Sequence, residues 1–390
     1  MNAIDVVIVG AGIIGCSTAY ELSKLGLNIE VIEKHEPGAM GSGWTLAGVR
    51  QSGRHDAEIP LAKYSVKVWS DLNDILDCET NYKQEGNLRL ARNNYEDKII
   101  KKLVEEQQKK GLEIEYLNNS KDIQEICPSL SSKIFSASYC PTDGHADPID
   151  TLRAYEKAAK KNGVIFSNNE EVLKISSKKN KINSITTNKR KIYPKYCILA
   201  NGIFCNKILE SVEKKIPLEI PIVTVIQTEI TSKILKPVIG VANANLAMRQ
   251  ENNGCFRISS GFQEWTGNLK LKNGMPYVET TLNEIQNTIS RSIDIIPELK
   301  NSSLKSFWGG LIDLTPDALP VIDNVIECEG LIIACGFSGH GFGIAPAVSN
   351  IISELVLNKK TKLPIDSFSL NRFQNYIFSK KQKSDLTLHG

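Results

Sequence analysis

Residues 4–33 follow the pattern of a strand, a glycine-rich turn, a helix and a second strand. Ile4 to Val9 is a short β-branched run of the kind that is buried on both faces of a parallel sheet. Apolar residues then recur at helical spacing, and Gly26 supplies the left-handed residue that commonly ends a helix. Asn28 to Glu33 is the second strand. The pattern predicts a βαβ unit, and with it an α/β domain built on a parallel sheet.

The turn in this unit has the spacing of a dinucleotide-binding loop, Gly10-x-Gly12-x-x-Gly15. One glycine makes the tight turn, one lets the backbone approach a pyrophosphate, and one permits close contact between strand and helix. The unpaired N–H groups at the start of the helix favour phosphate. Glu33 is placed to bind ribose hydroxyls and disfavours a 2′-phosphate, which indicates NAD or FAD. A tight turn that binds no nucleotide is the alternative, and the strand context together with Glu33 argues against it.

The residues after Glu33 distinguish these two cofactors. A nicotinamide dehydrogenase normally continues through regular βα units, whereas this chain enters a long loop rich in glycine and serine, residues 38–53. Such a loop can line the rest of an extended dinucleotide with small side chains and backbone donors. The loop therefore favours FAD.

A second glycine-rich stretch lies near the carboxyl end, between the predicted buried strand Leu331–Cys335 and a predicted helix that starts near Ile344. Four glycines occur in the eight residues 336–343, and Pro346 falls in the predicted first helical turn, where its missing N–H does no harm. The N-terminal dipole of this helix would stabilise the negative charge of a reduced flavin. A helix that merely packs on the sheet is the alternative, but it does not explain the four glycines.

With these motifs the chain resembles the D-amino-acid-oxidase-type superfamily of FAD-dependent oxidoreductases. Within that superfamily it is similar to sarcosine oxidase β-subunits, glycine oxidases and β-subunit-type proline dehydrogenases. The resemblance is carried, in the family's order, by Val9–Gly15 with Glu33, Gly41–Arg50, Asp143–Pro148, Leu199–Gly202, Trp308–Asp317 and Cys335–Phe342.

The resemblance implies two domains that are discontinuous in sequence. A Rossmann-like α/β domain that binds FAD would comprise residues 1–85, 140–215 and 305–370. An α+β domain, residues 86–139 and 216–304, would cover the flavin ring with an antiparallel sheet, and residues 371–390 would form a C-terminal tail. The resemblance also implies oxidation of a small amino or imino acid, such as sarcosine, glycine, proline or a related N-substituted amino acid. Hydride would pass to flavin N5, and the imine would then be hydrolysed.

Positions that match the family's motifs imply which residues would bind FAD. They are Gly10, Ala11, Gly12, Ile13, Ile14, Gly15, Glu33, Lys34, Gly41, Ser42, Thr45, Leu46, Val172, Ala200, Gly202, Gly310, Gly336, Gly339, His340, Gly341, Phe342 and Gly343. Monomeric sarcosine oxidases attach their flavin to a cysteine just upstream of the Thr-Pro-Asp turn. Gly310 stands at that place in this chain, so we expect FAD to be bound non-covalently.

Arg50 is the residue that we expect to bind the substrate carboxylate. A guanidinium can bind a carboxylate through two parallel hydrogen bonds and stays charged, and related oxidases have an arginine at the matching place. A phosphate contact or a surface charge is the alternative for Arg50. Arg249 is a second candidate for the carboxylate. His340 is expected either to act in catalysis, by contacting substrate or tuning the flavin, or to be purely structural.

Two departures from the family leave the substrate open. Gly343 stands where sarcosine oxidases have a lysine that helps to hold the substrate carboxylate, and Ile312 stands where glycine oxidases have a carboxylate-binding arginine. A dehydrogenase of 2-hydroxy acids and a flavin-binding subunit without turnover of its own are the alternative functions. Dioxygen or a protein or quinone acceptor would reoxidise the flavin, and the chain could form homo- or hetero-oligomers.

Composition argues against several other classes of protein. The 390 residues contain 47 Lys and Arg against 44 Asp and Glu, and this balance does not indicate nucleic-acid binding. No uncharged apolar run reaches the roughly 18 residues that a membrane helix needs. The five histidines and nine cysteines lack zinc-ligand spacing, so no metal is expected. The scattered, odd-numbered cysteines and the absence of a leader before the first strand predict a soluble cytoplasmic protein.

Overall fold

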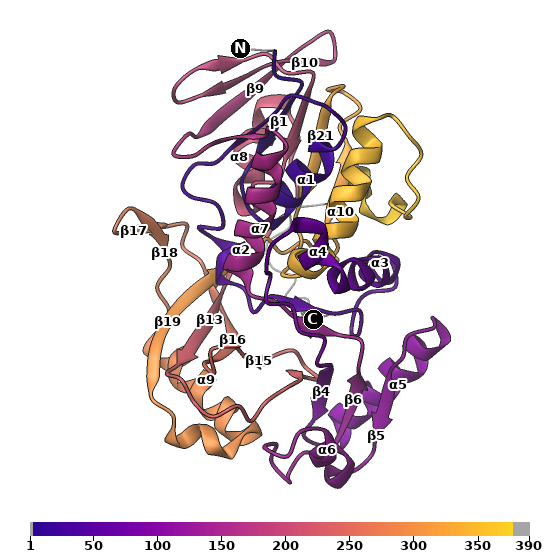
Figure 1. The fold of residues 1–390 in the computed structure, drawn as a ribbon, viewed down its shortest axis with the longest axis vertical. Coiled ribbons are helices and arrows are strands. Elements are labelled where there is room, and N and C mark those ends of the chain that lie inside the picture. The colour runs from indigo at the N-terminus through magenta and orange to yellow at the C-terminus, as the bar shows by residue number, and fades with distance from the viewer. Residues whose placement is uncertain (1–2, 377–390) are drawn as a thin grey trace.

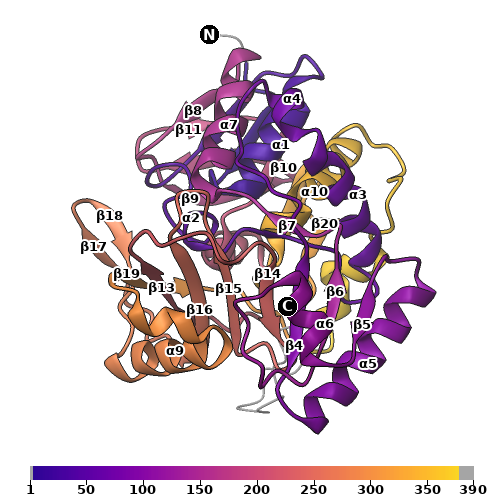
Figure 2. The same ribbon diagram turned by 60° about the horizontal axis from the view of Figure 1, so that its bottom comes forward.

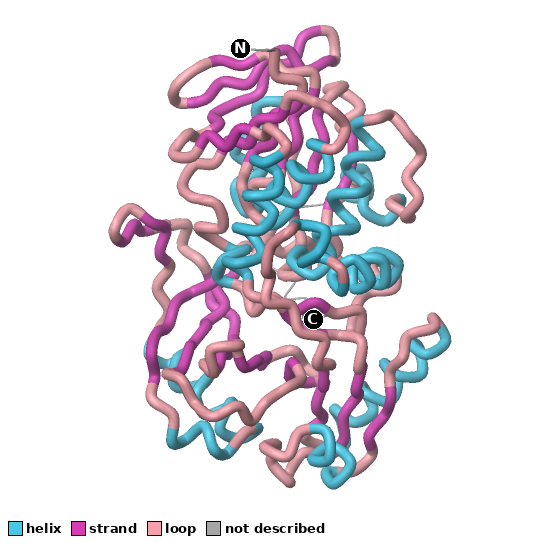
Figure 3. The backbone as a smooth tube through the Cα atoms, in the orientation of Figure 1, coloured by secondary structure: helices cyan, strands magenta, loops and turns pink. Residues whose placement is uncertain are grey.

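The computed structural model describes residues 3–376 and contains two large β-sheets, which lie in the upper and lower halves of Figures 1 and 3. The first sheet has the strand order β20-β21-β12-β1-β2-β8. Its strands are β1 (Val6–Val9), β2 (Ile29–Ile32), β8 (Ile165–Ser167), β12 (Tyr196–Leu199), β20 (Val321–Asn324) and β21 (Leu331–Cys335). All neighbours pair in parallel except β20 and β21. The predicted α/β class with a parallel sheet is confirmed.

The β-branched composition of β1 follows from its central position, because both faces of the sheet are covered. Val6 and Ile8 belong to a core with helices, whereas Val7 and Val9 belong to a core with a smaller antiparallel sheet. On the helical face lie α1 (Ile13–Ser23), α3 (Ile59–Ser70), α4 (Leu72–Leu76), α7 (Pro148–Lys161) and α10 (Gly341–Val356). On the other face lie β9 (Val172–Lys178), β10 (Lys181–Thr187), β11 (Lys191–Ile192) and α8 (Cys205–Leu209).

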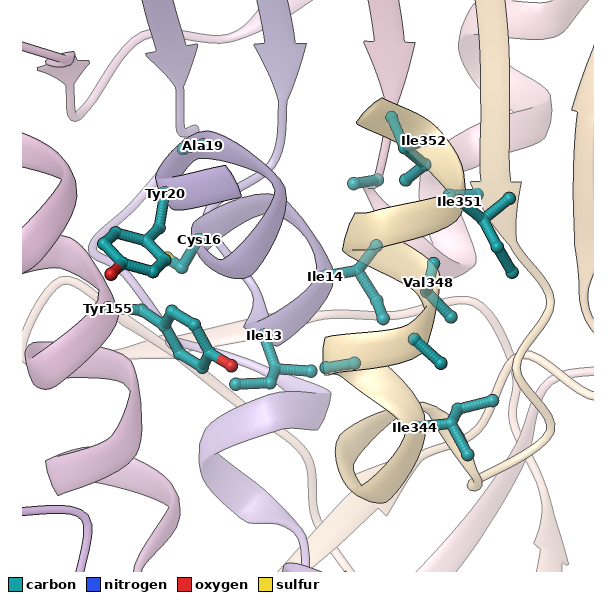
Figure 4. Packing of buried hydrophobic residues seen from close by; sticks show 14 of the residues in the cluster. Ile13, Ile14, Cys16, Ala19, Tyr20, Tyr155, Ile344, Val348, Ile351 and Ile352 are labelled. Carbon is teal, nitrogen blue, oxygen red and sulfur yellow. The ribbon is translucent and has the colours of Figure 1, made fainter. Parts of the chain in front are cut away.

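Helix α1 packs between α7 and α10 and thereby joins the two glycine-rich stretches in space. Figure 4 shows Ile14 of α1 beside Val348 of α10. On the opposite side, the rings of Tyr20 and Tyr155 meet edge to face, with their centroids 6.1 Å apart. The amino-terminal glycine loop and the carboxyl-terminal one therefore lead into neighbouring helices.

Helix α10 begins at Gly341, three residues before the predicted start, and this corrects the sequence-based boundary. Pro346 consequently lies inside the helix and not in its first turn. Glycine disfavours helices by about 1 kcal/mol per residue, so the sequence of 341–343 predicts a loop, but tertiary packing overrides that preference. A Cβ at Gly343 would lie 2.8 Å from the carbonyl oxygen of Gly48, so the first turn of α10 lies directly against the loop at Gly48.

Helix α3 holds this first turn through a buried indole. Trp69 is 1% exposed, stacks on Phe342 at 5.4 Å between centroids, and donates from Nε1 to the carbonyl oxygen of Gly343 at 2.9 Å.

Trp69→Phe would leave that buried carbonyl without its donor, so we expect the free energy of unfolding to fall by about 1–3 kcal/mol. Urea denaturation of the flavin-loaded protein measures the change. Trp265→Phe, which removes an exposed indole hydrogen bond to Asn268, is the matched control and should shift stability by no more than about 0.5 kcal/mol. Equal losses of stability in the two variants would show that the hydrogen bond from Trp69 does not stabilise the first turn of α10.

The second sheet has eight strands in the order β19-β13-β16-β15-β14-β4-β6-β5, and Figure 2 shows it across the lower half of the molecule. Its strands are β4 (Asn87–Ala91), β5 (Glu115–Leu117), β6 (Ser136–Cys140), β13 (Pro221–Thr228), β14 (Val238–Val241), β15 (Leu246–Gln250), β16 (Phe256–Glu264) and β19 (Leu304–Leu311). It is antiparallel except where β14 pairs with β4. Helices α5 (Asn94–Lys109), α6 (Ser120–Ile126) and α9 (Leu282–Ile295) accompany it.

The two-residue period of these strands separates a core face from a face turned to a cavity. Ile226, Met248 and Ile258 pack in the core beneath α6 and α9. Their chain neighbours Val225, Ala247 and Ser259 line a cavity on the opposite face. Because successive side chains in a strand point to opposite faces, the second sheet closes the lower core and also forms a wall of the cavity.

The structure also contains elements that the sequence analysis did not locate or assigned to the other domain. Helix α9 lies in the segment 216–304, for which the sequence analysis located no helix, although Thr281 and Glu284 form its N-terminal cap. Strand β19 pairs with β13 in the second sheet, although residues 305–311 fall in the segment assigned to FAD binding. Short pairs are formed by β3 (Gly48–Val49) with β7 (Gly144–His145) and by β17 (Lys270–Lys272) with β18 (Met275–Tyr277), and α2 (Gly41–Trp44) is a single turn.

In the predicted tail, Arg372 binds Asp317 and Phe373 packs against the core of the first sheet. Residues 377–390 lie outside the described residues. Among residues 3–376 no helix is both long and apolar enough to span a bilayer.

Candidate active site

A cavity opens at the carboxyl ends of β1 and β2, where the glycine loop begins. Its wall includes Val9, Ile32 and Phe204. The predicted cofactor residues that line it are Gly10, Gly12, Glu33, Lys34, Gly41, Ser42, Val172, Ala200 and Gly202. The carboxyl edge of a parallel sheet is where α/β proteins commonly bind ligands.

Close approaches explain the glycines of this loop. Gly10 has a φ of +101°, and a Cβ there would lie 2.7 Å from the carbonyl oxygen of Ala200. A Cβ on Gly15 would lie 1.9 Å from the carbonyl oxygen of Gly10, so strand and helix could not keep their contact. Gly12 lies on the cavity wall, so its backbone is open to a ligand.

Glu33 and Ser42 hold the start of α1 beside this cavity. Glu33 Oε2 accepts from the N–H of Ala11 at 2.7 Å, and Oε1 accepts from the N–H of His35 at 2.8 Å. Ser42 Oγ accepts from the N–H of Ile13 at 2.9 Å. The Glu33 carboxylate is thus fixed at the cavity wall, where ribose binding remains its proposed role.

A second cavity adjoins the first and shares Gly41, Ser42, Leu311 and Asp313 with it. The predicted residues that line it are Thr45, Leu46, Arg50, Gly310, Gly339, His340, Gly341 and Phe342. The loop that follows β2 and the loop that precedes α10 are therefore brought to one cavity. The wall opposite them includes Val223, Val225 and Ala247 of the second sheet.

Six predicted cofactor residues line neither cavity: Ala11, Ile13, Ile14, Gly15, Gly336 and Gly343. Ile13 and Ile14 are buried in the core around α1 and α10. Gly15 and Gly343 serve close packing, as the distances above show, and Gly336 donates its N–H to Asp313 Oδ2 at 2.8 Å. These six residues therefore set the backbone positions around the cavities and do not line the cavities themselves.

Arg249, the second predicted carboxylate ligand, also lines neither cavity. It is 2% exposed, its Nη1 lies 3.2 Å from His145 Nδ1, and its Nη2 lies 3.6 Å from Glu251 Oε1. Burial, with Arg257 nearby, lowers its pKa to about 10. The side chain therefore belongs to a buried polar cluster outside the residues that line the second cavity, and its role as a carboxylate ligand stays a prediction.

Two arginines lie on the wall of the second cavity, Arg50 and Arg54. Arg50 donates from Nη1 to the carbonyl oxygen of Ser52 at 2.6 Å, and Arg54 is 5% exposed with no hydrogen-bond partner at Nη1 among the described residues. Burial lowers the pKa of both guanidiniums from its ordinary value, and for Arg50 the neighbouring Arg54 and Arg89 lower it further. Sequence reasoning identified Arg50 and missed Arg54, which the four-residue spacing of two arginines in a glycine loop could have indicated.

His340 is bound by a carboxylate that the sequence did not single out. Its Nδ1 lies 3.1 Å from Oε2 of Glu58, which is fully buried. Burial lowers the pKa of His340 to about 4, against the opposing effect of Glu58. Burial raises the pKa of Glu58, but His340, Arg54 and Arg50 outweigh it and lower that pKa overall. The pair therefore consists of a neutral imidazole and a carboxylate.

Asp313 lies where the two cavities meet. Burial raises its pKa to about 6, although backbone N–H groups of residues 336–338 bind it and oppose that effect. The side chain ties the end of β19 to the loop before α10. Sequence reasoning noted the surrounding motif but did not assign a role to this residue.

The residues present fit an extended flavin dinucleotide. Gly10, Gly12 and Glu33 line the first cavity, and small or backbone-presenting residues of the segments 38–53 and 336–343 line the second. Gly310 is part of the second wall, and the residues that line the two cavities include no cysteine in the part of the chain described. This composition supports the expectation of non-covalent FAD, which remains a prediction.

Comparison with known proteins supports the same cofactor. The FAD dependent oxidoreductase family matches residues 5–355. The chain is 24% identical to sarcosine oxidase subunit beta of Arthrobacter sp, over 95% of this chain and 91% of that protein. It is 26% identical to human mitochondrial dimethylglycine dehydrogenase, of which it spans 44%. The crystal structure of L-proline dehydrogenase from P. horikoshii superposes with a TM-score of 0.88 at 29% identity, covering 96% of this chain and 98% of that one. The chain belongs to the FAD dependent oxidoreductase family, and FAD is its cofactor.

Proposed function

We propose that this flavoprotein oxidises the C–N bond of a small amino or imino acid that carries one carboxylate. The observation that carries the proposal is the pair of guanidiniums, buried Arg54 and half-buried Arg50, on the wall of the cavity that the two glycine-rich stretches also line. Guanidiniums bind carboxylates in a defined orientation. Such an anchor would hold one end of an amino acid and leave its C–N bond within the cavity.

The charges around the two arginines support a single substrate carboxylate. In addition to burial, Arg54 and Arg89 lower the pKa of Arg50, Arg54 also lowers that of Arg89, and the carboxylates that act on these three guanidiniums are Asp143 and Glu58. Three positive charges against two negative ones leave one positive charge without compensation. Because an unpaired buried charge is costly, a ligand with one negative charge is favoured there.

The opposite wall favours an amine with apolar substituents. It includes Val223, Val225, Val238, Ala247 and Phe262, and its polar side chains, Ser259 and Ser260, are uncharged. Among residues 3–376, Asp313 is the only acidic residue that lines this cavity, and it lies at the junction with the first cavity. The wall thus provides no carboxylate for an ammonium group, which favours the amine in its neutral, reactive form.

FAD, when bound, supplies the acceptor for the hydride that leaves the substrate. The chain's own residues hold the carboxylate through Arg50 and Arg54, exclude water with the apolar wall, and leave the amine lone pair free to assist the loss of hydride. The resulting imine would hydrolyse in water. A lysine could not replace Gly343 without displacing Gly48, whose carbonyl oxygen lies 2.8 Å from where a Cβ would stand. The anchor therefore relies on arginines from the other loop.

The relatives guide the finer choice of substrate. The names of the similar proteins specify sarcosine, dimethylglycine and L-proline, and all three are N-substituted amino acids. We propose that the substrate of this chain belongs to the same class.

A substrate panel under anaerobic conditions tests the proposal. The FAD-loaded protein is mixed with sarcosine, glycine, L-proline, D-proline or D-alanine, and with L-lactate as a 2-hydroxy acid, while the visible flavin absorption is followed. We expect sarcosine or L-proline to bleach the flavin and L-lactate to leave it oxidised. Bleaching by L-lactate alone would identify a 2-hydroxy-acid dehydrogenase, and no bleaching of a fully loaded flavin would favour a subunit without independent turnover. Admitting air after bleaching then distinguishes dioxygen from a protein or quinone acceptor.

A further inference from the structure

The Glu58–His340 pair joins two chain segments 282 residues apart at the wall of the second cavity. We propose that Glu58 is a positioning residue that fixes His340 in the tautomer with hydrogen on Nδ1, so that Nε2 accepts a proton from the substrate ammonium group. The proton-acceptor role rests on the proposed function, whereas the tautomer does not depend on it.

The tautomer follows from what each atom can donate or accept. A carboxylate only accepts hydrogen bonds, so Nδ1 of the neutral imidazole must carry the hydrogen that faces Glu58 Oε2 at 3.1 Å. Nε2 then keeps its lone pair. This nitrogen is buried and has no hydrogen-bond partner in the described protein, although His340 lines the cavity. Since buried polar atoms are almost always paired, a ligand in the cavity is the natural partner of Nε2.

The charged groups around His340 couple its basicity to substrate binding. Glu58 is in direct contact with His340, and Arg50 and Arg54 act from the loop that leads to Glu58. Asp313, which follows the end of β19, also lines the cavity. The two guanidiniums lower the pKa of His340. A substrate carboxylate that pairs with them would cancel this effect, so Nε2 would gain proton affinity when the substrate is in place.

The proton balance of this transfer is simple. One N–H bond of the substrate ammonium breaks, one N–H bond forms at Nε2, and the electron pair stays on the amine nitrogen. The positive charge moves onto the imidazole, where Glu58 compensates it. The amine is then neutral, with its lone pair available for the loss of hydride.

Nitrogen NMR of the FAD-loaded, ¹⁵N-histidine-labelled protein tests the tautomer without any turnover. We expect His340 to show a protonated Nδ1 and a bare Nε2. His145 provides an internal reference of the opposite kind, because Arg249 can only donate to its Nδ1 at 3.2 Å and burial keeps its pKa near 3. Glu58→Gln should remove the preference of His340 for hydrogen on Nδ1, since a side-chain amide can either donate to that nitrogen or accept from it. Glu96→Gln, which neutralises a buried carboxylate paired with Arg92 elsewhere, should leave it unchanged.

The pH dependence of flavin reduction tests the proton transfer. If His340 takes the proton within the complex, kcat/KM should be level from above pH 4, the pKa of His340 in the free protein, up to the pKa of the substrate ammonium. In His340→Asn the proton must leave before binding, so kcat/KM should instead rise about tenfold per pH unit over that range.

The outcomes separate this inference from the proposed function. A protonated Nε2 in the wild-type spectrum would overturn the inference whatever the substrate panel shows. A level profile retained in His340→Asn would overturn the proton-acceptor role even with an amino acid as substrate. If no amino acid bleaches the flavin, the proposed function and the acceptor role fail together, while a bare Nε2 that depends on Glu58 would still uphold the positioning role.

Discussion

The Gly15→Ala variant is expected to bind FAD about 100-fold more weakly than the wild type. A Cβ at this position would lie 1.9 Å from the carbonyl oxygen of Gly10 and 3.1 Å from its carbonyl carbon, and both are backbone atoms. Relief requires that α1 move away from β1, which shifts the N–H groups at the start of α1 away from the phosphates. Overpacking of this kind costs about 1–3 kcal/mol, and the upper value corresponds to the stated change in Kd. Flavin titration of the cofactor-free protein measures it.

Gly26→Ala is the matched control, because it places the same methyl group in the same βαβ unit. Gly26 has a φ of +71°, but no atom lies within 4 Å of its Cβ position. The strained backbone should cost about 1 kcal/mol of stability and leave the Kd for FAD within about twofold. If Gly15→Ala retains wild-type affinity, α1 does not position the dinucleotide phosphates.

Arg54→Ala is expected to lower kcat/KM for the amino-acid substrate about 300-fold while the FAD content stays unchanged. The guanidinium is buried at the cavity, and its Nη1 has no partner in the part of the chain that the structure describes, so the substrate carboxylate would be its partner. Loss of one member of a buried charge pair costs about 2–5 kcal/mol, and a value near the middle of that range gives the stated factor. Steady-state or anaerobic reduction kinetics measure the change.

Two comparisons make the Arg54 prediction specific. Arg54→Lys keeps the charge but loses the planar fork, so it should recover only part of the activity. Arg92→Ala, which breaks an ion pair with Glu96 on α5, should leave kcat/KM within about twofold. An amine that lacks the carboxylate should be oxidised equally slowly by the wild type and by Arg54→Ala. A large difference between the two proteins with that amine would show that Arg54 acts on something other than the carboxylate.

The sequence alone determined the elements whose signals are local. The run before Gly10, the three glycines and Glu33 predict a βαβ unit and a dinucleotide site because strand burial, turn conformation and helix termination depend on residues close in the chain. The small-residue loop to Arg50 and the glycines before α10 likewise predict where a flavin would lie. These signals were sufficient for the fold class and the cofactor.

The tertiary structure decided which side chains meet and where marginal helices begin. Glu58 and His340 lie 282 residues apart, and no local sequence pattern around either residue indicates their contact. Arg249 has the same side chain as Arg54, yet only Arg54 lines the cavity. The start of α10 at Gly341 depends on contacts with α3 and with Gly48. Such outcomes depend on which faces of distant elements are buried against each other, and a sequence pattern that repeats over two to four residues carries no record of that pairing.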